Sequence, residues 1–446
     1  MNTKQQLEKD LEEIKHTVQH ALDYAKKQGA DQAEVDMSRQ QGLSVSTRNT
    51  ELETVEFNQD GALGITVYAK NCKGSASTSD LSREAIEKTV EAACRIAQLT
   101  EADPCHGLAD PDRLARKILD LDLYHQHTVE PEQLTNMAIR SEQAALDAGA
   151  HMSDGASANA HYGLKVYGNS HQFLEGYISS RYSMSTVAIA KNQDKMQRDY
   201  DYTQHRKFDA LARPEIIGQE AAHKAQAKLN ARKLKTQNLP VIFHRNVATG
   251  LFGHFVSAIS GGNLYRKSSF LLDSLGQPIF PKSISIQENP HILQGLASAP
   301  FDAEGIQTQP STIIDQGVLQ TYLLTSYSGK KMNLPSTGHA GGIYNWQVSH
   351  TDMSHEALLK EMDTGILVTE VMGQGVNIVT GHYSRGAAGF YVENGEIQYP
   401  VEEITIAGNL KEMYQQIIGI DNEPDPRSSL KTGAVLIESM KIAGEA

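Results

Sequence analysis

Apolar residues recur at helical spacing near the start of the chain and then give way to alternation. The apolar stripe through Leu7, Ile14 and Leu22 predicts an amphipathic helix over 4–28. Polar and apolar residues then alternate, which predicts half-buried antiparallel strands. These strands are predicted at 33–36, 43–48, 51–57 and 64–69, with a turn at 58–61. A second helix is predicted over 82–98, with Ser82 as its N-cap.

A similar pattern of helices and strands is predicted after a turn-rich segment at 101–118. Its elements are a helix at 131–148, strands at 157–160, 164–167, 173–180 and 182–190, and a helix at 214–229. Two explanations stay open, an internal duplication and two unrelated α+β meanders. The basic run Lys228–Lys235 that follows is interpreted as a solvated linker.

The pattern changes again from Leu239, where short apolar runs and recurring glycines begin. A buried strand is predicted in PVIFH at 240–244, and a helix over 247–260. Asn394-Gly395 between two strand-like runs predicts a β-hairpin. The fold class is therefore predicted as α+β. Two N-terminal α/β units with antiparallel or mixed sheets, 1–105 and 125–230, precede a β-rich C-terminal domain, 238–446.

Charge and composition narrow the function classes. The chain has 41 Lys and Arg against 54 Asp and Glu, a net charge of −13. This balance disfavours non-specific nucleic-acid binding, which needs a basic face. No run approaches the roughly 18 apolar residues of a membrane span, and the N-terminus has no apolar signal core. We expect a cytoplasmic protein that binds neither membrane nor nucleic acid. Three cysteines without a paired spacing, Cys72, Cys94 and Cys105, are interpreted as reduced thiols.

Local motifs for known chemistry are incomplete. His355-Glu356 lacks a second histidine one turn later, because position 359 is Leu, so Ser354 is expected to cap a surface helix. The glycine-rich MGQG at 372–375 has no following GK[ST], and AISGGNLY does not match a dinucleotide fingerprint. Either these glycines form tight turns, or they expose backbone with which a peptide pairs as an added strand. No GxSxG nucleophile elbow is present.

Five longer segments carry a resemblance to a known family. They are ATGLFGHFVSAISGGNLYRKSSFLL at 248–272, and the segments 45–68, 323–346, 364–410 and 440–446. Together they resemble the TldD/PmbA metallopeptidases, and within them the PmbA (TldE) branch. The resemblance implies two N-terminal α/β units and a β-rich C-terminal domain. It also implies a heterodimer that degrades peptides, with roles in microcin maturation and antitoxin breakdown, and an older description as a modulator of DNA gyrase.

The zinc motif of that family is missing from this chain. Metal-bearing members of the TldD branch carry His-Glu-x-x-x-His, with a C-terminal cysteine as a further ligand. Aligned on SGGNLYRKSSFL, the motif positions fall on Phe252, Gly253 and Ser257, and a shift of one residue puts Gly253 and Ala258 at the histidine positions. No cysteine follows residue 105. A catalytic zinc needs about three protein ligands, so the resemblance implies no metal here and zinc in a TldD-like partner.

The histidines and the glycine-rich segments also supply candidate residues for binding a peptide or a partner. They are His254, Gly261, Gly262, Asn263, Arg266, His339, Ser384, Arg385 and Gly386. Arg385 is a candidate positive group for a substrate or partner carboxylate, with an ordinary surface arginine as the alternative.

Three hypotheses follow. The leading one is a non-catalytic subunit that pairs with a TldD-like zinc-bearing chain and contacts peptide substrates, with a homodimer when isolated. The second is an autonomous metallopeptidase whose relocated site uses His254, His339, His382 or Glu370. The third is a regulator that binds gyrase or toxin–antitoxin proteins directly.

Overall fold

The N-terminal half repeats one order of elements. The computed structural model describes residues 4–444, so the last two residues of the tail 440–446 lie outside the described residues. The first set is α1 (Lys4–Lys27), β1 (Gln32–Arg48), β2 (Glu51–Ala69), β3 (Cys72–Thr78) and α2 (Arg83–Leu99). The second is α3 (Pro131–Asp147), β4 (Met152–Asn169), β5 (Phe173–Asn192), β6 (Lys195–His205) and α4 (Pro214–Ala227). Two 3-10 turns, Pro111–Arg113 and Phe208–Ala210, lie in the connections.

The two sets share one six-stranded antiparallel sheet in the order β3-β2-β1-β4-β5-β6. The first strand of each set lies at the centre, and β1 pairs with β4 along most of its length, from Glu34↔Asn169 to Thr47↔Ala156. The strand order is therefore symmetric about this central pair. Such symmetry, together with the repeated element order, favours internal duplication over two unrelated meanders.

The predicted turn at 58–61 is wrong, and so are the breaks between the shorter predicted strands. Asn58 pairs with Gly42 and Gly61 with Arg39 inside one unbroken β1–β2 ladder. Likewise Ser180 pairs with Tyr162 within the continuous β5. Residues that favour turns are held extended here because each backbone group finds a partner on the next strand. Non-local pairing overrides such local preferences.

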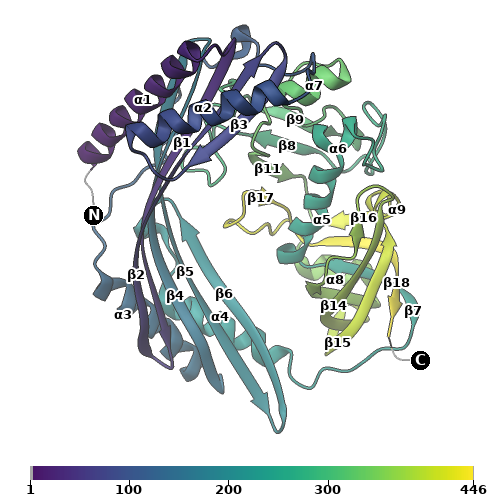
Figure 1. Ribbon diagram of the computed structural model, residues 1–446. Coiled ribbons are helices and arrows are strands. Elements are labelled where there is room, and N and C mark those ends of the chain that lie inside the picture. The colour runs from purple at the N-terminus through teal and green to yellow at the C-terminus, as the bar shows by residue number, and fades with distance from the viewer. Residues whose placement is uncertain (1–3, 445–446) are drawn as a thin grey trace.

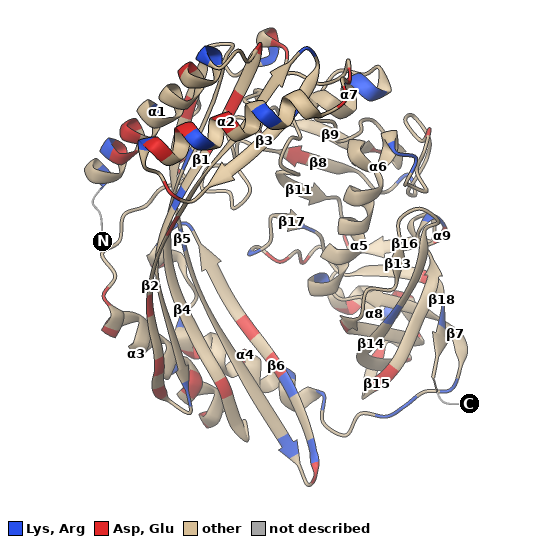
Figure 2. Cartoon of the chain, viewed as in Figure 1, with Lys and Arg blue, Asp and Glu red and all other residues tan. Residues whose placement is uncertain are grey.

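The four N-terminal helices pack on one face of this sheet (Figure 1). In β4 the even-numbered residues from Ala156 to Val166 are buried, while the odd-numbered ones between them are half-buried. Strand side chains alternate between faces, so the helix-covered face is the same along the whole strand. α2 begins at the predicted cap, where the Ser82 side chain accepts a hydrogen bond from the Ala85 amide. Acidic and basic residues are interspersed along α1 and α2 (Figure 2).

The C-terminal half is β-rich, as predicted. Its strands are β7 (Gln237–Phe243), β8 (Ile286–Asn289), β9 (Ser311–Asp315), β10 (Val318–Leu319), β11 (Asn345–Val348), β12 (Gly365–Met372), β13 (Val376–Asn377), β14 (His382–Glu393), β15 (Glu396–Asn409), β16 (Ile417–Ile420), β17 (Leu430–Lys431) and β18 (Val435–Ala443). Its helices are α5 (Arg245–Ala258), α6 (Gly261–Tyr265), α7 (Ser326–Met332), α8 (His355–Met362) and α9 (Leu410–Gln415). The Asn394-Gly395 hairpin joins β14 to β15 as expected.

These strands form two sheets around the largest hydrophobic core of the described chain. One is five-stranded, in the order β10-β9-β8-β11-β17. The other is seven-stranded: six strands run β12-β7-β18-β15-β14-β13, and the seventh, β16, pairs with β18. Because β12 also pairs with β14, five of its strands close into a ring. The predicted α+β fold class is confirmed.

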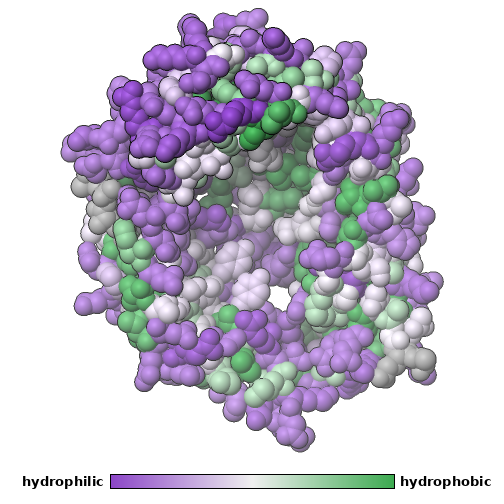
Figure 3. Space-filling view, viewed as in Figure 1, coloured by the Kyte–Doolittle hydropathy of each residue, from purple (hydrophilic) through white to green (hydrophobic). Residues whose placement is uncertain are grey.

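The C-terminal half meets the long sheet near both ends of its strands. At one end Phe173 of β5 packs edge-to-face on Phe301, with ring centroids 5.2 Å apart. At the other, Lys228 forms ion pairs with Asp199 at 2.9 Å and Glu370 at 2.8 Å. A hollow remains between the two halves and is still visible with all side chains drawn (Figures 1 and 3). We call it the central hollow.

Lys228 corrects the interpretation of 228–235 as a wholly solvated linker, because its side chain is only 11% exposed. A buried ammonium is tolerated where carboxylates pair with it, and tertiary folding supplies two. Within residues 4–444, no helix is long and apolar enough to cross a membrane. The three cysteines are free thiols, as predicted.

Two helical glycines, one at a close helix contact and one without neighbours, allow a test of the packing between α3 and α4. A Cβ added to Gly218 of α4 would collide with the Ser141 carbonyl oxygen of α3, whereas one added to Gly250 of α5 has no heavy atom within 4 Å. We expect Gly218→Ala to lower the free energy of unfolding by about 1–3 kcal/mol through overpacking. Gly250→Ala should raise it by about 0.5–1 kcal/mol, because alanine favours a helix. Urea unfolding followed by far-UV circular dichroism measures both; equal effects would contradict the contact.

Candidate functional site

Helix α5 holds the aligned motif positions and borders the central hollow (Figure 1). One side of the helix lies in the C-terminal core. Phe252 is fully buried, and its ring lies 6.1 Å from that of Phe280. Phe255 and Ala258 are also fully buried on this side. The residue at the first histidine position is therefore part of an aromatic core.

On the opposite side of α5, Gly250 is exposed, while Gly253 and Ser257 are half-buried. A Cβ added to Gly250 or Gly253 would have no heavy atom within 4 Å. Ser257 follows one turn after Gly253, and its hydroxyl donates to the Gly253 carbonyl at 3.1 Å. We call Gly250, Gly253 and Ser257 the open face of α5. Phe252 and Ser257 thus point to opposite sides of the helix, and the one-residue shift fails as well because Ala258 is buried. These residues do not fit a zinc ion.

His254 lies on the flank of α5 that faces β14. Its ring is 6.0 Å from that of Tyr383. Burial, and after it the charge of Arg385, lower the pKa of His254. Burial raises the pKa of Tyr383 to about 12, against the opposing charge of Arg385. Folding therefore brings together two predicted residues from distant segments, His254 and Arg385. We call His254, Tyr383 and Arg385 the α5–β14 junction.

His339 lies in a separate, buried network. Its Nε2 is 2.7 Å from a Glu288 carboxylate oxygen and its Nδ1 is 2.8 Å from the Thr337 hydroxyl. The same carboxylate accepts hydrogen bonds from the Tyr344 amide and the Trp346 indole. Burial opposes ionisation of Glu288, but these hydrogen bonds hold its pKa below the ordinary value. Both ring nitrogens of His339 are engaged, so this histidine offers no free ligand.

The predicted residues at 261–266 build the corner after α5. Gly261 is buried, and a side chain there would collide with Ser328. The Asn263 amide donates to the Ser257 carbonyl at 2.8 Å and so fixes the corner. Gly262 faces the guanidinium of Arg266, which is exposed and lies over the Tyr265 ring at 5.2 Å. Gly261 and Asn263 are therefore structural, and Arg266 alone of this group presents a charge to solvent.

The remaining candidates are dispersed. Ser384 and His382 are exposed on β14, on the face opposite Tyr383, while Gly386 is half-buried beside Met372. Glu370 is already paired with Lys228. Within residues 4–444, no three His, Cys, Asp or Glu side chains are placed to hold a metal ion. The structure does not assemble His254, His339, His382 or Glu370 into a relocated metal site.

Two other sequence features have structural explanations. Ser354 caps α8 as predicted, accepting from the Ala357 amide at 3.1 Å, and His355 contacts the buried Asp421 at 2.8 Å. In MGQG, Gly373 has φ +79°, and the Gly375 carbonyl accepts from the Ser384 amide at 2.7 Å. This segment is a tight turn whose backbone pairs within the chain.

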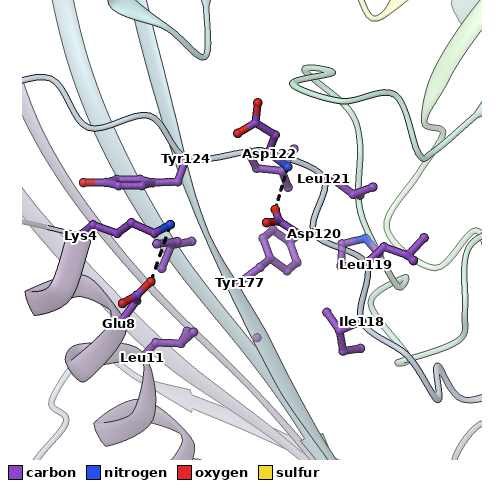
Figure 4. Close-up of a pocket in the computed structure, with 14 residues that line it drawn as sticks. Lys4, Glu8, Leu11, Ile118, Leu119, Asp120, Leu121, Asp122, Tyr124 and Tyr177 are labelled. Atoms are coloured by element: carbon purple, nitrogen blue, oxygen red, sulfur yellow. Dashed lines mark hydrogen bonds and ion pairs between the residues drawn. The ribbon is translucent and has the colours of Figure 1, made fainter.

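Two cavities lie away from α5. One, of about 300 Å³, is lined by α1, the segment 118–124 and β5, and its Lys4 and Glu8 pair at 3.9 Å (Figure 4). The other, of about 550 Å³, lies between 111–116 and the loops 306–312 and 335–339. In it Arg113 already donates to the Ser336 carbonyl. Neither cavity combines an unpaired charge with a reactive group.

Three family models match successive parts of the chain. They describe a PmbA/TldA metallopeptidase domain 1 at 33–97, a central domain at 124–229 and a C-terminal domain at 236–444. A metalloprotease PmbA of Escherichia coli O157:H7 is 53% identical over 442 residues, which cover 99% of this chain and 98% of that relative. The chain belongs to the PmbA/TldD metallopeptidase family. A metalloprotease PmbA homolog of Haemophilus influenzae is also 53% identical, over 97% of this chain and 96% of its own length.

Solved structures share this fold. A Bacteroides thetaiotaomicron protein, described as a candidate modulator of DNA gyrase, superposes with a TM-score of 0.91 at 27% identity. That match covers 97% of this chain and 99% of the other. TldE from Thermococcus kodakarensis has a TM-score of 0.84 at 22% identity, covering 96% and 100%, and shows likeness of fold alone.

Sequence reasoning missed Gly250 and Tyr383. Gly250, Gly253 and Ser257 are spaced i, i+3, i+7, a stripe of small residues that marks one side of a helix. That spacing is a usable signal for the open face. Tyr383 carries no comparable signal, because its contact with His254 joins residues far apart in the chain.

The two sides of α5 predict opposite responses to histidine. Phe252→His should lower the free energy of unfolding by about 3–5 kcal/mol, the range for removing a buried Phe side chain. Ser257→His should change it by less than about 0.5 kcal/mol, because the new ring extends from the open face. The single tryptophan, Trp346, lies in the same core and its fluorescence during urea unfolding measures both variants. Similar losses would contradict the assignment of sides.

Proposed function

We propose that this chain is the non-catalytic subunit of a cytoplasmic peptidase complex, paired with a TldD-like chain that carries zinc. The observation that supports this most directly is the state of the motif positions. Phe252 is core, Gly253 has no side chain, and Ser257 points away from Phe252. A helix of this kind can line a substrate chamber but cannot activate a metal-bound water.

The open face of α5 supports a role in accommodating peptide. Glycine without neighbours allows an extended backbone to approach closely. Helix α5 borders the central hollow (Figure 1), and we propose that a peptide within the hollow lies along this face. Relatives are named metalloproteases, which supports peptides as the substrate class. The proposal includes microcin maturation and antitoxin degradation as roles of the complex.

Zinc stoichiometry tests the proposal. Plasma mass spectrometry is applied to the purified chain, to a TldD-like chain from the same source, and to their mixture. We expect no zinc in this chain, and about one zinc per heterodimer in the mixture because a catalytic site needs one ligand set. Peptide hydrolysis should require the TldD-like chain and stop with a chelator.

Other results would favour the alternatives. Chelator-sensitive hydrolysis by this chain alone would support an autonomous peptidase. A pull-down that recovers gyrase or a toxin–antitoxin protein, but no TldD-like chain, would support a regulator; the described gyrase modulators among the solved relatives make this the second candidate.

A bulky residue on the open face tests the chamber directly. Gly253→Tyr should reduce hydrolysis by the mixed complex about tenfold, a loss of about 1.4 kcal/mol, because the ring occupies the space for peptide. Capture of the partner and thermal unfolding should be unchanged. Glu84→Tyr is the control, since that side chain is 79% exposed on α2. Full activity of Gly253→Tyr would contradict a peptide path along α5.

A further inference from the structure

Arg385 is a half-buried cation that lacks an anion. Its Nε is buried and has no hydrogen-bond partner. Among residues 4–444, no hydrogen bond or ion pair to its guanidinium is present either, whereas the other partly buried arginines have partners. Arg427 pairs with Asp201 at 2.9 Å and Asp425 at 2.7 Å. The Nε of Arg206 is also unpartnered, but its terminal amino groups donate to three backbone carbonyls, those of Ser180, Gly295 and Leu296.

Among residues 4–444, the titratable groups that interact with Arg385 are His254 and Tyr383, and neither is a carboxylate. Arg385 lies on the same side of β14 as Tyr383, since strand residues alternate, and its pairing partner on β15 is Ile406. From α5 the nearby titratable group is His254, whose lowered pKa leaves it neutral near pH 7. On the neighbouring strand β12, the carboxylate of Glu370 is used by Lys228. The α5–β14 junction is therefore locally cationic.

The junction adjoins the open face of α5. Gly250 and Ser257 are spaced four and three residues from His254, so they lie on the same flank of the helix. No heavy atom of the protein fills the space where a Gly250 Cβ would lie. A ligand lying along α5 would thus bring its end, or a side chain, to Arg385.

We propose that Arg385, with His254 beside it, binds a carboxylate of a peptide ligand at the α5–β14 junction. A guanidinium matches a carboxylate with two parallel N–H···O hydrogen bonds. The carboxylate is either the C-terminus of the peptide or an Asp or Glu side chain within it. This inference deepens the proposed function, on which it rests for the identity of the ligand as a peptide.

Fluorescence anisotropy with three short labelled peptides tests the inference. The first peptide is Ala- and Ser-based with a free C-terminal carboxylate, the second is its C-terminal amide, and the third is the amide with one internal Asp. We expect the first or the third to bind the wild-type chain about tenfold more tightly than the plain amide. The peptide that binds more tightly identifies the source of the carboxylate.

Variants assign this preference to Arg385. Arg385→Gln should abolish it, while Arg385→Lys keeps part of it, because lysine retains the charge without the fork. Arg95→Gln, at an arginine 68% exposed on α2, is the matched control and should bind like wild type. Equal binding of all three peptides, or an unchanged preference in Arg385→Gln, would overturn the inference.

Further measurements separate loss of folding, loss of peptide binding and loss of the partner. Thermal unfolding checks that each variant is folded; if Arg385→Gln is not, the NMR signals of the His254 ring replace it. Adding the preferred peptide to the wild-type chain should raise the pKa of His254, and no change would overturn the inference. Partner capture and zinc content of the mixture should be normal for Arg385→Gln if the proposed function holds. Loss of capture with no peptide preference would instead assign Arg385 to a partner carboxylate.

Discussion

The antiparallel pairing of β1 with β4 is the contact on which the molecule depends. It joins two similar three-stranded units into one sheet, with their helices on a single face. The shared sheet is long enough for the C-terminal half to contact it near both ends, at Phe173–Phe301 and at Lys228–Glu370. A separate sheet in each unit would leave their relative position to a linker. The central hollow is therefore a consequence of strand pairing.

One side of helix α5 stabilises the C-terminal core, and the other side is accessible to a ligand. Its bulky residues fill the aromatic core, and a Cβ added to either of its two glycines would have no heavy atom within 4 Å. Each histidine of a metal site would have to come from one of these two sides. The core side admits no imidazole without loss of packing, and the open face lacks a companion ligand. The division of α5 into a packed side and an open face therefore explains both why the helix holds no zinc ligands and why part of it is accessible.

Buried charges distinguish structural sites from candidate binding sites. Lys228, Arg427 and Arg206 all lie at contacts between the two halves of the chain. Lys228 and Arg427 pair with carboxylates, and the terminal amino groups of Arg206 donate to backbone carbonyls. A desolvated charge without a partner is costly, so these three groups are readily explained by folding. Arg385 differs, since its guanidinium faces a neutral histidine and a protonated tyrosine. That contrast, and not exposure alone, separates it from an ordinary surface arginine.

Local patterns were sufficient for the longer helices, the hairpin at Asn394-Gly395 and the α+β class, but not for the short helices α6, α7 and α9. Each depends on residues close together in the chain, where helical spacing, caps and turn chemistry act. The union of two units into one sheet, the extended course of 58–61 and the burial of Lys228 were decided by tertiary structure. So was the approach of Arg385 to His254, which lie more than a hundred residues apart. Backbone pairing and charge burial depend on contacts between segments that are distant in the chain, so a local sequence pattern does not predict them.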